Sequence, residues 1–186
     1  AEIFKATFLT LLFSILVWLS LASLAVDPLL ANDDPSFYAS AGYVNRELLE
    51  IDVAASSYEA VGTLPVFNRA IAQDADSGYV YYYEWLTSGN EFGYWNPATG
   101  TNTTVRTYSP APGFYVIRME IALDGTLYVM DVQDRLYTID KQNGNYQLLG
   151  TVSGMVGGAY GGTGDMAFAP NGTLYVATYE NLYTVN

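Results

Sequence analysis

Short runs of alternating apolar and polar residues, each ending at a turn, fill the chain from residue 37 onward. Clear examples are Leu-Tyr-Val at 127–129 and 174–176, and Leu-Tyr-Thr-Ile at 136–139. Alternation with period two, in β-branched and aromatic residues, predicts strands. Asp-Gly at 124–125 and Asn-Gly at 171–172 supply the left-handed backbone of tight hairpin turns. The pattern therefore predicts antiparallel hairpins.

These hairpins repeat. Three turn glycines recur at a constant interval of 47 residues: Gly78, Gly125 and Gly172. A second register recurs every 44 residues at the turn residues Asp52, Asn96 and Asp140. Each unit has room for about four short strands in about 45 residues, which is the size of a β-propeller blade. A β-solenoid or a β-sandwich is the alternative, although sandwiches do not repeat at a fixed period.

The repeats resemble secreted bacterial β-propeller repeats of the Leu-Tyr-x-Ile-Asp type, and the likeness covers residues 37–186. That length corresponds to 3 to 4 blades, fewer than the six to eight that the resemblance implies. We expect a compact ring of four blades, an incomplete set whose sheet edges are covered by neighbouring subunits, or a piece of a longer protein.

An uncharged apolar segment precedes the repeats. Residues 6–26 carry no charged side chain, and as a helix they would be about 31 Å long, close to the thickness of a bilayer core. Asp27-Pro28 ends this pattern. We therefore predict a mainly β protein with one long apolar N-terminal α-helix at 1–27, a linker at 28–36 and a β-propeller-like head at 37–186.

Three roles are open for this helix: a secretory signal, a membrane anchor, or the core of a filament. The segment resembles the N-terminal helix of type IV pilin-like subunits. Bacterial pilins usually have Glu at the fifth mature position, whereas this chain has Lys5, so the resemblance is to archaeal-type pilins. It implies that the helix packs in a filament core through Phe4, Phe8, Leu11, Leu12, Ser14, Ile15, Leu16, Trp18 and Leu19.

Composition excludes several kinds of chemistry. The 186 residues include no His and no Cys, which argues against Ser-His-Asp or Cys-His catalysis and the common zinc sites. A net charge of −12 argues against nucleic acid, because phosphates are bound by Lys and Arg. We predict no enzymatic activity, no catalytic or metal-binding residues and no cofactor.

Three other features suggest binding. The aromatic residues Tyr81, Tyr83, Trp85 and Trp95 could stack on a sugar ring, although packing between blades is the alternative use of such residues. The acidic pairs at 74–76 and 131–134 could bind calcium, or they could stabilise turns. Glu47 and Glu50 would serve glycoside hydrolysis only if they faced each other across a cleft.

Asn102 and Asn171 each begin an Asn-x-Thr acceptor pattern for N-glycosylation. Taken together, these features predict a structural subunit of an extracellular pilus-like filament, with apolar helices in the core and propeller-like heads outside that present an adhesive surface. Its partners would be copies of itself, the membrane before assembly, and a surface glycan or protein receptor. The alternative is a membrane-anchored or secreted β-propeller module that binds a carbohydrate or a protein.

Overall fold

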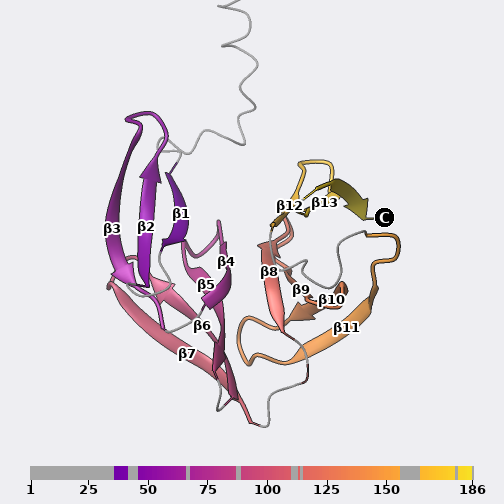
Figure 1. Cartoon of the computed structure of the whole chain (residues 1–186). Coiled ribbons are helices and arrows are strands. Elements are labelled where there is room, and N and C mark those ends of the chain that lie inside the picture. Colours follow the sequence, from indigo (N-terminus) through magenta and orange to yellow (C-terminus); the bar gives the residue numbers. More distant parts are fainter. Residues whose placement is uncertain are drawn as a thin grey trace, which may run out of the picture. The chain divides into compact units, whose positions relative to one another are not determined.

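Figure 1 shows the computed structural model of the chain, which describes residues 36–41, 46–65, 68–86, 89–109, 113, 115–155, 164–178 and 180–185. In these ranges the chain forms four small antiparallel sheets. It divides into two compact units: one is Phe37–Ile51 with Tyr58–Asn186, and the other is Ala1–Ser36 with Asp52–Ser57. The sheets belong to the first unit, apart from Ser36 and the turn at 52–57.

Two of the sheets have three strands in the described part of the chain. One has the order β1-β2-β3 and comprises β1 (Ser36–Ala41), β2 (Glu47–Asp52) and β3 (Ser57–Thr63). The other has the order β12-β13-β14 and comprises β12 (Met166–Phe168), β13 (Leu174–Ala177) and β14 (Leu182–Val185).

The two central sheets have four strands each, joined in chain order. The first has the order β4-β5-β6-β7 and comprises β4 (Asn68–Gln73), β5 (Val80–Leu86), β6 (Gly89–Asn96) and β7 (Thr101–Tyr108). The second comprises β8 (Val116–Ile121), β9 (Leu127–Asp131), β10 (Arg135–Ile139) and β11 (Tyr146–Thr151), again joined as successive hairpins.

The turns repeat as the sequence predicts. Gly78, Gly125 and Gly172 adopt φ of +74°, +80° and +83°, the left-handed conformation that glycine adopts without strain. Asp124 Oδ1 accepts the Thr126 N–H at 2.9 Å, and the equivalent side chain, Asn171, accepts the Thr173 N–H at 3.0 Å. The 47-residue spacing is therefore a repeat of turn geometry as well as of sequence.

A main-chain hydrogen bond also repeats, at an interval of 88 residues. The Arg46 carbonyl accepts the Leu64 N–H at 2.9 Å, and the Asp134 carbonyl accepts the Val152 N–H at 2.9 Å. Arg46 and Asp134 both have positive φ, 55° and 59°, although neither is glycine. In each case the acceptor residue directly precedes one strand, β2 or β10, and the donor residue directly follows the next strand, β3 or β11.

The core lies between successive sheets, because each strand directs alternate side chains to opposite faces. On β5, Val80 and Tyr82 are buried with Leu48, which lies on β2, and with Leu64, which directly follows β3. Tyr81 and Tyr83, on the opposite face of β5, join the apolar residues of β8–β11, among them Met119, Leu127, Val129, Tyr137 and Ile139. A third cluster combines Met130 with residues of β12–β14, among them Met166, Leu174 and Val176.

The prediction of a mainly β chain with one long N-terminal helix was wrong for the structure as described. The described residues contain strands and turns and no helix, because alternation with period two dominates their sequence. None of them belongs to a helix long and apolar enough to cross a membrane. The predicted helix at 1–27 and its core positions Phe4, Phe8, Leu11, Leu12, Ser14, Ile15, Leu16, Trp18 and Leu19 lie outside the described residues.

Candidate binding site

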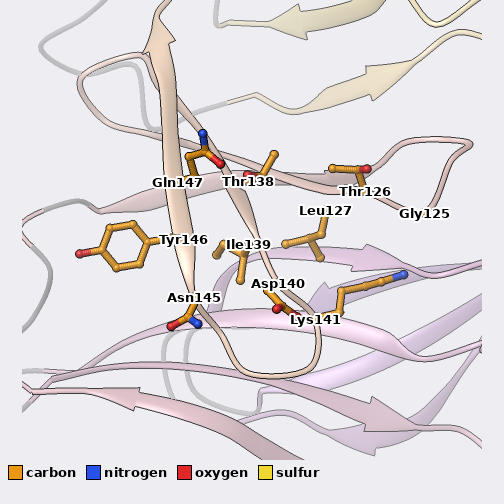
Figure 2. Close-up of a pocket in the computed structure, with 10 residues that line it drawn as sticks. All are labelled: Gly125, Thr126, Leu127, Thr138, Ile139, Asp140, Lys141, Asn145, Tyr146 and Gln147. Carbon is orange, nitrogen blue, oxygen red and sulfur yellow. The ribbon is translucent and has the colours of Figure 1, made fainter.

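A cavity of about 510 Å³ lies at one end of the β8–β11 sheet (Figure 2). The turn between β8 and β9, the turn between β10 and β11, and the strand ends beside them form its wall. The lining residues are Gly125, Thr126, Leu127, Thr138, Ile139, Asp140, Lys141, Asn145, Tyr146 and Gln147. This volume falls within the range of about 300–1,000 Å³ that is usual for small-ligand sites.

The polar side chains of the cavity come from neighbouring strands in register. Thr138 on β10 is the cross-strand partner of Gln147 on β11, so the two lie on the same face of the sheet. Figure 2 shows both side chains pointing to the same side, while Leu127 and Ile139 point to the other. Leu127 and Ile139 belong to the core against β4–β7, so Thr138 and Gln147 lie on the opposite face.

Acidic residues hold the turns beside the cavity. Two hydrogen bonds from Thr126, one from its N–H and one from its side chain, lower the pKa of Asp124. Asp140 accepts the Gln142 N–H at 2.8 Å and the Asn143 amide at 2.6 Å. These contacts fix the two hairpin turns and leave Thr126, Thr138 and Gln147 at the cavity surface.

The lysine of the cavity is neutralised from the neighbouring sheet. Lys141 Nζ lies 3.1 Å from Asp74 Oδ2, and it also lies 5.9 Å from the centre of the Tyr81 ring. Tyr146, although 42% exposed, makes edge contacts with Tyr108 and Tyr137, and its ring points away from Thr138 in Figure 2. The cavity is therefore lined by hydroxyl and amide groups with little net charge.

The aromatic residues predicted to stack on a ligand lie elsewhere. Tyr81 is 6% exposed, Tyr83 is 1% exposed and Trp95 is 3% exposed, because all three pack in the core between sheets. The side chain of Trp85 lies outside the described part. The prediction of an exposed stacking surface at Tyr81, Tyr83 and Trp95 is corrected: their rings pack between blades, which was the alternative interpretation.

Both predicted glycosylation residues are exposed and already make structural contacts. The Asn102 amide donates to the Thr63 carbonyl at 2.8 Å, which links β7 to the end of β3. The Asn171 side chain accepts the Thr173 N–H in its hairpin turn. Glycosylation at either position stays a prediction.

The acidic candidates are engaged in turns and ion pairs. Asp74 accepts the Ser77 hydroxyl at 2.7 Å, in addition to Lys141. Asp131 is fully buried and lies 2.6 Å from Arg135 Nη2. No group of three or more His, Cys, Asp or Glu residues suited to a metal occurs among the described residues. Glu47 and Glu50 are three apart on β2, so they face opposite sides of one strand.

A buried carboxyl group on β5 and a half-buried one on β8 have raised pKa values. Glu84 on β5 is 2% exposed and directly opposes Glu91 on β6. Burial, with the Glu91 charge as a second cause, raises the pKa of Glu84 to about 7, against a smaller effect of Arg46. On β8, burial and the charge of Asp165 raise the pKa of Glu120 to about 7. Neither group lines the cavity.

Sequence reasoning missed the residues of the cavity, because it searched for aromatic and acidic side chains. One signal was nevertheless present. Counting by the repeat, Thr126 and Thr138 stand where the preceding unit has Tyr79 and Tyr94. A small polar residue in the place of a large aromatic one marks a position where packing is incomplete.

Comparisons with known proteins extend the description of the fold. No protein-family model matches the chain, and no curated protein matches it. Among solved structures, a protein of unknown function from Bacteroides thetaiotaomicron VPI-5482 is similar with a TM-score of 0.60 and 15% identity, over 82% of this chain and 39% of that one.

Two further structures are similar over comparable lengths. An auxiliary nutrient binding protein from the same organism has a TM-score of 0.56 and 15% identity, over 81% of this chain and 36% of that one. TolB from Acinetobacter baumannii has a TM-score of 0.50 and 13% identity, over 80% of this chain and 40% of that one. The chain thus spans less than half the length of each of these three structures. The four small antiparallel sheets therefore form a β-propeller-like fold.

Proposed function

We propose that this chain is a β-propeller-like binding module whose ligand is a neutral carbohydrate, bound at the cavity beside β9, β10 and β11. One observation carries the proposal: a cavity of about 510 Å³ is lined by Thr126, Thr138 and Gln147. The Thr138 hydroxyl and the Gln147 amide can both donate and accept hydrogen bonds, and the Thr126 hydroxyl, which donates to Asp124, can accept one. Sugar hydroxyl groups have the same double capacity. A ligand rich in hydroxyl groups therefore matches this lining better than an apolar one.

Charge favours a neutral ligand. The chain has a net charge of −12, which repels polyanions, and Lys141 at the cavity is already paired with Asp74. A cationic ligand would meet Asp140, but both oxygens of that carboxylate accept hydrogen bonds within its own turn. A neutral sugar requires no charged partner.

The lining contains no group suited to catalysis. Besides the apolar Leu127 and Ile139, its side chains are hydroxyl, phenol, amide, paired ammonium and turn-bound carboxylate, and the two carboxyl groups with a pKa of about 7 lie outside it. We therefore propose binding without chemical conversion. With few direct contacts, the affinity for one sugar residue is expected to be on the order of 0.1–1 mM.

An extracellular location is part of this proposal. One similar structure is described as an auxiliary nutrient binding protein, and a soluble sugar or a surface glycan is accessible to a secreted or surface-attached module. The similarity to that protein concerns the fold, so it supports the class of binding module and leaves the ligand to experiment.

Binding of neutral glycans tests the proposal. The purified chain is applied to an array of neutral and acidic glycans, and the affinity for each bound glycan is then measured by calorimetry. Gln147→Leu and Thr138→Val are expected to weaken binding about tenfold, because each removes a polar contact. Thr103→Val, at the position of β7 equivalent to Gln147, is the matched control and should bind as the wild type does. If the wild type binds no glycan, the proposed function is wrong.

A further inference from the structure

The cavity occupies positions that a pair of tyrosines fills in the preceding sheet. Thr126 follows the turn glycine Gly125 just as Tyr79 follows Gly78. Thr138 precedes Asp140 by two residues just as Tyr94 precedes Asn96. The strand registers agree, because Thr138 pairs with Tyr128 as Tyr94 pairs with Tyr81. The two threonines and the two tyrosines are thus equivalent positions of the repeat.

In the β4–β7 sheet the two phenol rings form a parallel stack. The ring centres of Tyr79 and Tyr94 lie 4.4 Å apart, with an angle of 1° between the ring planes. Both side chains are partly buried and pack against the core that this sheet shares with β8–β11. The stack therefore fills the end of that face of the sheet.

In the β8–β11 sheet the same positions carry two threonines, and both threonines line the cavity. Tyr128, the equivalent of Tyr81, is retained and lies 5.0 Å from Phe168 of β12, measured between ring centres. The buried residues Leu127 and Ile139 also line the cavity.

We infer that this cavity is a slot for a single sugar ring, which takes the place of the missing tyrosine pair and is the terminal residue of a glycan. The inference rests on the proposed function and adds the mode of recognition to it. The threonine methyl groups offer apolar contact to the ring, while the Thr138 hydroxyl and the Gln147 amide donate to and accept from its hydroxyl groups, and the Thr126 hydroxyl, which donates to Asp124, accepts from them.

A double substitution that copies the preceding sheet tests the slot. Thr126→Tyr with Thr138→Tyr refills the space with side chains that these repeat positions already accommodate at Tyr79 and Tyr94. We expect the variant to keep the β-sheet circular dichroism of the wild type and to lose binding of the array-identified glycan by about tenfold or more. Thr126→Ser with Thr138→Ser is the control: it retains both hydroxyls without filling the slot, and its affinity should stay within about threefold.

The length of the glycan provides a second test. A monosaccharide and an oligosaccharide with the same terminal residue should bind within about threefold of each other, because one ring makes the contacts. An increase of about tenfold or more with length would overturn the inference, since it requires contacts outside the slot. Backbone amide shifts at Thr126, Thr138 and Gln147 during titration report the site directly, and their absence in wild-type protein that binds the glycan would also overturn it.

The outcomes separate the two proposals. If the wild type binds a glycan and the tyrosine variant binds it equally well, the slot is wrong and carbohydrate binding stands. If the wild type binds no neutral glycan, the proposed function fails and the inference fails with it. If the tyrosine variant does not fold, the amide shifts and the glycan-length series, both measured on the wild type, still test the slot.

Discussion

The Tyr108 hydroxyl donates a 2.6 Å hydrogen bond to the Gly144 carbonyl and thereby joins β7 to the turn between β10 and β11. Tyr108 is 4% exposed, so the bond is shielded from water. Arg106 lies two residues earlier on β7 and donates to the Asn145 side chain in the same turn. The contact between the two central sheets is thus polar at this end and apolar in its middle.

Removing the Tyr108 hydroxyl should weaken this contact. Tyr108→Phe leaves the Gly144 carbonyl buried without its donor, which we expect to lower the free energy of unfolding by about 1–2 kcal/mol. Tyr58→Phe is the control, because Tyr58 is 73% exposed. Urea unfolding measures both, and an equal effect of the two substitutions would contradict the role assigned to Tyr108.

Gly144 should tolerate substitution less well than its repeat equivalent, Gly100. Both have positive φ, +70° and +65°, so alanine at either position is strained by about 1 kcal/mol. A β-carbon at 144 would also lie 2.6 Å from Arg106 Cβ, whereas one at 100 would meet nothing within 4 Å. We expect Gly144→Ala to cost about 1–3 kcal/mol more than Gly100→Ala in thermal or urea unfolding.

Stability should rise as the pH falls from 8 to 5. Burial raises the pKa of Glu84 to about 7 in the folded chain, above the ordinary value of 4.5, so the folded state binds a proton more tightly than the unfolded state. The stabilisation is present at low pH and is lost as the pH rises through 7. Glu84 should contribute on the order of 2 kcal/mol over this range.

Glu84→Gln is the variant that isolates this effect. It keeps the shape of the side chain and removes its titration, so the melting temperature should depend less on pH than in the wild type. Glu120 also has a raised pKa, of about 7, and retains part of the dependence in that variant. A wild-type melting temperature that is constant between pH 5 and 8 would contradict the prediction.

Asp131 should be the costliest single carboxylate to remove. It is fully buried, accepts the N–H groups of Gln133 and Arg135 at 2.9 and 3.0 Å, and accepts Arg135 Nε at 2.7 Å. Asp131→Ala leaves these donors without an acceptor and should cost about 3–4 kcal/mol. Asp140→Ala, which removes an exposed turn residue, should cost about 1 kcal/mol in the same unfolding experiment.

Much of the sheet architecture could be predicted from sequence, because its determinants are local. Gly78, Gly125 and Gly172 fix the hairpin turns through backbone conformation, and the alternation at Leu127–Val129 fixes which side chains enter the core. Such features need only the order of neighbouring residues. The number and chain order of strands in the central sheets follow from them.

The candidate site depends on two aromatic side chains that the preceding repeat has and this one lacks, and it was therefore harder to predict. Tyr81 and Tyr83 resemble a ligand platform in sequence, yet the sheet that packs over them makes them core residues. Thr126 and Thr138 are inconspicuous until they are compared with Tyr79 and Tyr94 across the repeat. Their importance arises from long-range packing, which a local pattern does not record.

Two main-chain hydrogen bonds, from Leu64 to Arg46 and from Val152 to Asp134, affect which residues of such a sheet can be substituted. Each tie uses only amide and carbonyl groups, so the bond itself involves none of the four side chains, and the positive φ of Arg46 and Asp134 is what restricts the residues at those two positions. Mutations can accumulate at these loop ends while the closure of the sheet is retained. A protein that shares only 15% of its residues with this chain has a similar fold, with a TM-score of 0.60.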